Sequence, residues 1–388
     1  MLAPDRYQLL GPIASGGMAE VLLARTRGPG GFERLLAVKR IKPELSRDPE
    51  QVRMFLDEAR NAARLVHHNI VQVIDVDLRD GAVFYAMEYL HGQTLDSVIA
   101  RARVLPRDAA VAIGIAIAAG LHHAHERPSS IVHRDVAPSN VMVTYDGNVK
   151  LIDFGIAKAT ENLSRTAFGM FKGRLGYSSP EQCRCEPVDR RTDIYSLGVV
   201  LYELTTGRRT FTADSDPELL DHMAQARVTP PRALDASYPP QLETIVMRAL
   251  AAAPGDRYPT ADALQRDLED LARISALNLS AVSLSRLMGE LFAEELAPWR
   301  AAQKTGITLE EHITRHTLID VPPTFDTWAL ERVATAARET ALERKTTVAR
   351  PPARGTRPPS REPRVWLGVV AMICLFGLGY LIARWWIS

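Results

Sequence analysis

The 388-residue sequence contains only three cysteines and carries almost no net charge. Cys183, Cys185 and Cys374 cannot form a disulfide framework, so we expect a reducing compartment. Cys183 and Cys185 have no second pair of ligands nearby, which argues against a metal site there. A net charge of +1 gives no sign of a nucleic-acid partner. The first residues show no secretory signal.

The remaining composition is that of a globular protein, with 46% hydrophobic and 24% charged residues. A chain of this length is expected to form two or three units, one of them large enough for a substantial core. Composition therefore indicates a globular protein, and the function has to be inferred from local motifs.

The stretch 131–155 contains the polar residues that indicate chemistry. Asp135 follows a His-Arg pair, Asn140 stands five residues later, and Asp153 opens an Asp-Phe-Gly triplet. Asp135 would accept the proton of a hydroxyl nucleophile. Asn140 and Asp153 offer the hard oxygen ligands that Mg²⁺ prefers. Together these residues suit the handling of a triphosphate beside an incoming alcohol.

A β-hairpin is predicted between Asn140 and Asp153. The segments 141–143 and 149–152, which are apolar apart from Lys150, flank the pair Asp146-Gly147, which is a turn signal. The two ends of a hairpin lie side by side. Asn140 and Asp153 should therefore meet at its open end, although thirteen residues separate them.

This ordered set resembles the catalytic and magnesium-binding loops of eukaryotic-like (Hanks-type) protein kinases, in their bacterial serine/threonine branch. The resemblance covers residues 7–274 and implies an α+β fold with two lobes. The small lobe (7–88) would hold an antiparallel sheet and one helix, and the large lobe (92–274) would be helical. ATP and Mg²⁺ are the implied cofactors, and protein Ser/Thr hydroxyls are the implied acceptors. Autophosphorylation is expected as well.

A glycine turn lies between the first two of three strands expected within 7–41. Aligned on Val21, the kinase pattern G-x-G-x-x-G-x-V places Ala14, Gly16 and Ala19 at its glycine positions. Alanine restricts positive φ, so we expect a stiffer loop than usual. The resemblance assigns nucleotide contacts to Ile13, Ala14, Gly16, Gly17 and Val21.

An apolar strand ending in Lys39 resembles the V-A-I-K strand of kinases, in which the lysine reaches the α- and β-phosphates. The helix expected at 49–65 has Glu58 where the family carries the partner of that lysine. The resemblance therefore places Lys39 and Glu58 with Asp135 in the catalytic set. Strands are expected at 69–77 and 82–88. The segment after them resembles the interlobe hinge, where backbone groups of Glu88 and Leu90 would pair with adenine.

The large lobe is expected to contain helices at 94–102, 106–127, 216–225, 240–250 and 262–272. Three histidines, His122, His123 and His125, end the second helix. Their spacing does not converge on one point, and cationic side chains favour helix C-termini, so a metal cluster is not expected.

A polar segment at 161–176 would be the activation loop. It carries Ser164 and Thr166, on which a phosphate could dock against Arg134. The segment ends in a Ser-Pro-Glu triplet whose Glu181 is expected to pair with Arg257 inside the large lobe. Asp193 is expected at the start of the helix that braces the catalytic loop.

Two departures from the family pattern stand near the site. Ala137 replaces the lysine found two residues after the catalytic aspartate, and Gly173-Arg174 replaces a threonine that helps to bind substrate. A pseudokinase acting as a membrane-tethered nucleotide-binding scaffold is therefore the alternative interpretation. We expect activity, because the other motif residues are kept and tyrosine kinases have an alanine near this point. A small-molecule kinase is a third interpretation, which the Ser/Thr-bearing activation loop argues against.

The sequence after residue 274 is expected to form a helical extension at 275–345. Helical periodicity is found at 284–292 and again at 325–344. Packing against the large lobe and self-association are the two interpretations of these helices. A homodimer is therefore one of the partners considered.

A Pro/Arg-rich linker at 346–364 precedes the charge-free segment 365–383. As a helix this segment would be about 28 Å long, which matches a bilayer core. Tryptophans lie near both of its ends. Five arginines precede it and only Arg384 follows it, which predicts a single-pass inner-membrane protein with a cytoplasmic kinase domain.

Overall fold

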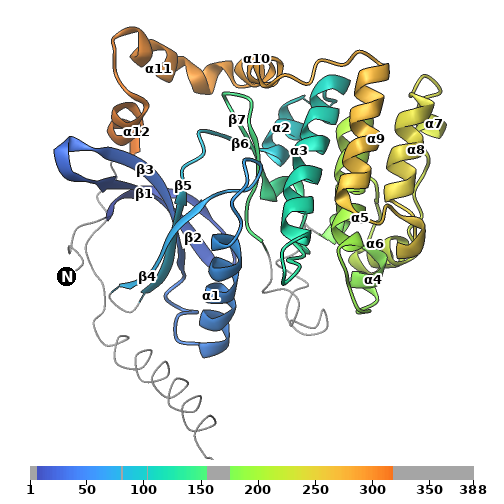
Figure 1. Cartoon of the computed structure of the whole chain (residues 1–388), viewed down its shortest axis with the longest axis horizontal. Helices are drawn as coiled ribbons and strands as arrows, with labels where there is room; N and C mark the ends of the chain where they lie inside the picture. The colour runs from blue at the N-terminus through green and yellow to red at the C-terminus, as the bar shows by residue number, and fades with distance from the viewer. Residues whose placement is uncertain (1–6, 80–81, 103, 155–174, 318–388) are drawn as a thin grey trace, which may run out of the picture. The chain divides into compact units, whose positions relative to one another are not determined.

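A five-stranded antiparallel sheet and one helix, α1, form the small lobe (Figure 1). The computed structural model describes residues 7–317 except 80–81, 103 and 155–174. The strand order is β1-β2-β3-β5-β4. The strands are β1 (Tyr7–Ser15), β2 (Ala19–Arg27), β3 (Glu33–Ile41), β4 (Val73–Arg79) and β5 (Ala82–Glu88).

Helix α1 (Pro49–Ala63) begins where the sequence provides a cap. The side chain of Asp48 accepts a hydrogen bond from the backbone N of Glu50, and Pro49 occupies the first turn. The buried face of the helix includes Phe55 and Ala59, which join the core between α1 and the sheet. Full burial of Phe55 contributes about 1.5–3 kcal/mol, so this face fixes α1 on the sheet.

Strand β4 begins at Val73, four residues later than the sequence pattern predicts. The residues before it pair with the large lobe instead. The backbone N of Val71 donates to the carbonyl of Leu151, and the N of Leu151 donates to the carbonyl of Asn69. The Asn69 side chain also donates to the carbonyl of Val149. The segment between α1 and β4 is thus bonded to the large lobe at residues 69–71.

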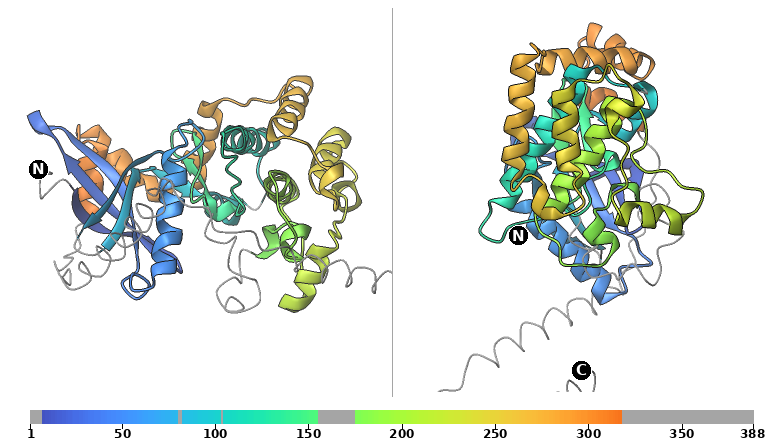
Figure 2. Two further views of the ribbon diagram at one scale, coloured as in Figure 1. Left: turned by 60° about the horizontal axis from the view of Figure 1, so that its bottom comes forward. Right: turned by 90° about the vertical axis from the view of Figure 1, so that its right-hand side faces the viewer.

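The large lobe is built around α3 (Arg107–His125) and α5 (Arg191–Thr206), which are buried along most of their lengths. At Gly114 the side chain of Leu201 lies so near that a Cβ atom would meet it. The lobe also contains α2 (Leu95–Ala102), α4 (Pro180–Cys183), α6 (Asp216–Ala224), α7 (Pro231–Leu234), α8 (Pro240–Ala249) and α9 (Ala261–Ile274). Figure 2 shows these helices on the side of the molecule away from the small-lobe sheet.

A second, three-stranded sheet lies where the large lobe meets the hinge. Its order is β6-β7-β8, with β6 (Gly92–Thr94), β7 (Val141–Thr144) and β8 (Val149–Leu151). The predicted hairpin is confirmed as β7–β8, and Gly147 in its turn has a φ of 87°. Strand β6 has only three residues, which is too short for a recognisable sequence pattern.

Three helices continue the described chain beyond α9: α10 (Ala281–Leu291), α11 (Ala293–Lys304) and α12 (Leu309–Thr317). The sequence pattern at 284–292 predicts most of α10. Figure 1 shows α10 above the large lobe and α12 beside the small-lobe sheet. The second predicted helix at 325–344, the linker at 346–364 and the charge-free segment 365–383 lie outside the described residues. Within the described part of the chain, every helix is too short or too polar to cross a membrane.

Candidate active site

Asn140 and Asp153 lie at the open end of the β7–β8 hairpin, where the sequence pattern predicts them. The backbone N of Ile152 donates to the carbonyl of Asn140 at 2.9 Å, which closes this end. The amide nitrogen of Asn140 donates to the carboxylate and to the backbone carbonyl of Asp135, both at 2.8 Å. This arrangement joins the expected catalytic aspartate to one expected metal ligand.

The residues at this end of the hairpin fit a magnesium ion. The side-chain oxygen Oδ1 of Asn140 is buried and has no hydrogen-bond partner among the described residues. An unpaired buried oxygen is unfavourable unless something binds it. Asp153 provides a carboxylate whose side chain is 31% exposed, so it is open to a ligand. An amide oxygen and a carboxylate are suitable ligands for Mg²⁺.

The buried carboxylate of Asp193 holds the catalytic loop in place. Its two oxygens accept the backbone N–H groups of His133 at 2.8 Å and Arg134 at 2.7 Å. The ring of His125 approaches one of the same oxygens at 2.7 Å. Arg134 has a φ of 65°, a conformation that costs a non-glycine residue about 1–3 kcal/mol. The bonds to Asp193 hold the loop in this shape.

Lys39 contacts both lobes through two carboxylates. Its ammonium lies 2.7 Å from Oε1 of Glu58 and 2.6 Å from Oδ1 of Asp153. Burial alone would lower the pKa of Lys39, but the negative charges of Asp153 and Glu58 outweigh it. The pKa of Lys39 therefore lies well above its ordinary value, and the side chain stays charged. The expected pair of Lys39 and Glu58 is present.

Tyr85 is a member of this cluster that the sequence pattern does not reveal. Its hydroxyl donates to Oε1 of Glu58 at 2.7 Å, the same oxygen that Lys39 contacts. Burial is the main cause of a strongly raised pKa for Tyr85, so the hydroxyl keeps its proton and acts as the donor. In the sequence, Tyr85 is simply one of several apolar and aromatic residues of strand β5.

The glycine turn connects β1 and β2 without strained backbone. Ala14 lies in β1 opposite Val21, and Ala19 begins β2, so both alanines have strand conformations. Gly16 donates its backbone N–H to the carbonyl of Ala19 at 2.8 Å. Positive φ is not found at Gly16 or Gly17 in the described turn. Ala14 and Ala19 therefore do not force this turn into a disfavoured φ, and the expected stiffening of the loop does not come from that cause.

Leu90 is a hinge residue whose backbone groups remain available. The N–H and C=O of Leu90 form no hydrogen bond with any other described residue. Glu88 is more occupied, because its backbone N donates to the carbonyl of Gln72, and its carboxylate accepts from Lys150 at 2.7 Å. Of the two predicted adenine contacts, Leu90 therefore has the freer backbone. Lys150 is a further partner that the sequence pattern does not reveal.

Ala137 presents no charge to the site. Its side chain is buried and belongs to the core of the large lobe. The structure therefore has no equivalent of the family lysine at this position. Ser164 and Thr166 of the predicted activation loop, and the pair Gly173-Arg174, lie outside the described residues.

The expected pair of Glu181 and Arg257 is present and almost fully buried. Two guanidinium nitrogens donate to the two carboxylate oxygens at 2.7 and 2.8 Å, and Thr192 donates to one of them. Burial raises the pKa of Glu181, but these hydrogen bonds and the positive charge lower it more, so the net shift is downward. Next to Glu181, the side chain of Gln182 donates to the carbonyl of Arg134. The pair thus adjoins the catalytic loop.

The histidines that end α3 have separate environments. His125 is buried and binds Asp193, a role that the sequence pattern does not reveal. His122 and His123 line a surface hollow of about 520 Å³ together with His67 and His68. No group of three or more His, Cys, Asp or Glu within the described ranges is arranged to hold a metal ion.

The sequence model of the protein kinase domain matches residues 7–268. The chain belongs to the protein kinase family. Its domain is of the bacterial serine/threonine (Hanks) type, with a two-lobed fold. The matched region contains all of the motif residues described above.

Several curated bacterial kinases are similar to the chain. The tyrosine-protein kinase MasK of Myxococcus xanthus is 41% identical over 313 residues, which is 78% of this chain and 48% of that protein. The serine/threonine-protein kinase PrkC of Bacillus subtilis is 36% identical over 273 residues, which is 70% of this chain and 41% of that protein. The chain thus spans about half or less of the length of these relatives.

The kinase domain of Mycobacterium tuberculosis PknI has a similar crystal structure. Its TM-score is 0.54 at 29% identity, and the match covers 69% of this chain and 96% of that one. The match with MasK reaches further along the chain. At 78% of 388 residues, about 303 are aligned, so the alignment extends well past residue 268.

Proposed function

We propose that the protein is an ATP- and magnesium-dependent kinase that phosphorylates serine and threonine hydroxyls of proteins, including its own. The observation that supports this most is the joint contact of Lys39 with Glu58 and Asp153 beside the Asn140–Asp135 pair. It gathers a permanent cation, three carboxylates and an amide where a triphosphate and a hydroxyl would meet. The free backbone groups of Leu90 would receive adenine.

In this proposal each residue has one task. Lys39 would neutralise the α- and β-phosphates, and Glu58 would hold Lys39 in place. Asn140 and Asp153 would hold Mg²⁺, which would supply positive charge to offset that of the triphosphate. Asp135 would accept the proton of the incoming hydroxyl. The hydroxyl oxygen then bonds to the γ-phosphorus, the bond from that phosphorus to the β,γ-bridging oxygen breaks, and ADP leaves.

Asp135→Asn tests the proposed activity. The variant should lower phosphoryl transfer to a generic protein and to itself by about 100- to 10,000-fold, the range of general-base catalysis. Nucleotide affinity and the thermal midpoint should remain unchanged. The matched control is Asp146→Asn in the turn of the same hairpin. Undiminished transfer by the Asp135 variant would remove the assignment.

Phosphoamino-acid analysis of the products tests the acceptor. Phosphoserine and phosphothreonine are expected, as for the relatives named serine/threonine kinases. A product containing mainly phosphotyrosine would contradict this part of the proposal and would match the specificity for which MasK is named. Mass spectrometry of the wild-type protein after incubation with ATP would show whether Ser164 or Thr166 carries phosphate.

A pseudokinase is the second candidate, because Ala137 supplies no cation at the transferring group. The same assays separate the two functions. Wild-type protein that binds ATP with magnesium, yet transfers no phosphate over a long incubation, would establish the scaffold function instead.

Membrane attachment through 365–383 is a separate part of the proposal. It is supported by a charge-free stretch of bilayer length and by the excess of arginine before it. Deletion of 365–388 should move the protein from the membrane fraction to the soluble fraction, with the kinase domain on the cytoplasmic side. An unchanged distribution would contradict the membrane anchor but would not bear on the proposed kinase activity.

A further inference from the structure

Helices α10, α11 and α12 connect the large lobe to the small lobe on the hinge side. In Figure 1 they run from the top of the large lobe to the small-lobe sheet, and the left view of Figure 2 again shows orange helices beside that sheet. Helix α10 contacts α2 and β7, whereas α12 contacts β1 and β3. We call this segment, Ala281–Thr317, the hinge brace.

The base of the brace is part of the large-lobe core. Leu284 and Met288 of α10 are buried in that core. The hydroxyl of Ser285 donates to the backbone carbonyl of Tyr145 at 2.7 Å. At Gly147, in the β7–β8 turn, a Cβ atom would collide with the carbonyl oxygen of Ala281. The α10 backbone therefore rests directly on the hairpin that ends at Asn140.

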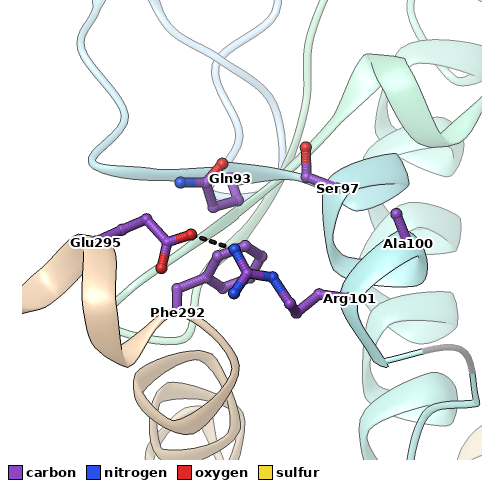
Figure 3. A pocket seen from close by; sticks show the side chains of 6 residues that line it. All are labelled: Gln93, Ser97, Ala100, Arg101, Phe292 and Glu295. Carbon is purple, nitrogen blue, oxygen red and sulfur yellow. Dashed lines mark hydrogen bonds and ion pairs between the residues drawn. The ribbon is translucent and has the colours of Figure 1, made fainter.

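A second contact joins the start of α11 to α2. Arg101 of α2 forms an ion pair with Glu295, and its guanidinium lies 5.2 Å from the ring centre of buried Phe292 (Figure 3). These side chains line a hollow of about 430 Å³, as does Gln93 of β6. The base of the brace is thus fixed at two separate points of the large lobe.

The middle of the brace touches the hinge through aromatic rings. The indole of Trp299 in α11 lies 6.2 Å from the His91 ring at an interplanar angle of 88°. The same indole lies 5.5 Å from the ring of His312 in α12. Edge-to-face ring contacts at such separations are attractive. Trp299 therefore links the hinge to the last helix of the brace.

The tip of the brace packs on the strands that carry the nucleotide residues. Ile313 packs against the buried cluster of Leu10, Leu23 and Leu35, and Tyr89 of the hinge packs against the same cluster. Side chains two residues apart share one face of a strand. Leu23 therefore shares a face of β2 with Val21, and Leu35 shares a face of β3 with Lys39. The tip presses on the same faces that would meet the nucleotide.

We propose that the hinge brace fixes the small-lobe sheet over the bound nucleotide, with Ile313 and Trp299 as positioning residues. The base is anchored in the large lobe, and the tip holds β1–β3, so the brace limits rotation of one lobe against the other. The inference rests on the proposed nucleotide binding. The MasK alignment, which extends past the kinase domain, reaches the residues that form α10 and α11.

The test compares full-length wild-type protein with Ile313→Ala, Ile313→Asp and Trp299→Ala. The matched control is Lys304→Ala, an exposed residue of α11. Affinity for a fluorescent ATP analogue with Mg²⁺ should fall about tenfold in Ile313→Asp, and less in the two alanine variants. Amide hydrogen exchange should accelerate in β1–β3 and the hinge, and remain unchanged in α5, α8 and α9. The control should match the wild type in both measurements.

Unchanged affinity and unchanged exchange in β1–β3 for the Ile313 variants would overturn the brace. Faster exchange throughout the large lobe in Ile313→Ala would also overturn it, since the contact would then serve general stability. Neither measurement needs phosphoryl transfer. Wild-type protein that binds ATP but transfers nothing would refute the proposed activity alone. Active protein with unaffected Ile313 variants would refute the brace alone.

Discussion

Asp193, which holds the catalytic loop, has no exposed surface, whereas Asp153, which meets Lys39 between the lobes, keeps 31% of its side chain exposed. The carboxylate oxygens of Asp193 bind two backbone N–H groups and the His125 ring, all within the large lobe. Lys39 instead depends on carboxylates from α1 and from the large lobe. The large-lobe half of the site is therefore assembled by folding alone. The small-lobe half, around Lys39, depends on the position of the two lobes relative to each other.

Among the residues that support the two halves of the site, Asp193→Asn should produce the largest effect, because it disrupts the large-lobe half. The amide would direct N–H groups at the donors of His133 or Arg134, which shifts the loop that carries Asp135. A displacement of about 1 Å can reduce kcat about a hundredfold. Steady-state kinetics should show this loss with nearly unchanged nucleotide affinity. The control is Asp189→Asn, a surface acid just before α5, and an equal loss there would contradict the comparison.

Arg257→Ala tests whether the same half also carries stability. It leaves the carboxylate of Glu181 buried without its partner, which should lower the free energy of unfolding by about 3–5 kcal/mol. Urea denaturation followed by circular dichroism measures this value. Arg273→Ala is the matched control, because its pair with Asp270 is exposed and contributes about 1 kcal/mol or less. Similar losses in both variants would show that burial does not distinguish the two pairs.

Tyr85→Phe addresses the small-lobe half. It removes one hydrogen bond to Glu58 and keeps the packing of the ring, so the stability loss should be about 1.5–3 kcal/mol at most. If Lys39 depends on an oriented Glu58, the KM for ATP should rise while kcat changes little. Kinetics at varied ATP concentration provides the measurement. A fall in kcat at constant KM would place Tyr85 with the catalytic loop instead.

The smallest expected effect concerns His67, which lies in the segment between α1 and β4, where the small lobe is bonded to the large lobe. Burial, then the neighbouring charges of His68, His123 and Lys150, lower its pKa from 6.5 to about 4. Between these two pH values the unfolded chain binds a proton that the folded chain does not, so stability falls as the pH drops from 6.5 toward 4.

The measurement for His67 is urea denaturation at pH 7.5 and pH 5. Because the ring is partly exposed, the loss at pH 5 should be about 1 kcal/mol or less. His67→Asn, which cannot titrate and keeps an acceptor for the backbone N of Asn69, should lose less stability over the same interval. An identical loss in the variant would assign the pH dependence to other groups.

Much of the fold is predictable from the sequence, because the kinase motifs occur at fixed spacings. Strand β5 and the start of α1 agree with the prediction to the residue. Strand β4 was placed too early because residues 69–71 pair with β8, and an apolar run does not reveal its partner. For a similar reason the sequence predicts no separate strand β6 and does not delimit helix α12, which lies within the helical extension expected at 275–345. Both are short and are stabilised by contacts with distant parts of the chain.

The site shows the same division. Lys39, Glu58, Asp135, Asn140 and Asp153 lie together as the motifs predict, and their catalytic roles stay predictions until the variants are measured. The supporting residues were not predictable. His125, Tyr85 and Lys150 belong to none of the kinase motifs, and each acquires its role from a partner at least 27 residues away in sequence.

The hydrogen bonding of Asp193 has a consequence for how such an enzyme could be inactivated. Since both carboxylate oxygens are used inside the large lobe, the catalytic loop has little freedom to adopt a second shape. A resting form would therefore differ mainly in the place of α1, with Glu58 withdrawn from Lys39. An inhibitor that selects that form should recognise the space vacated behind α1, and would leave the loop around Asp135 undisturbed.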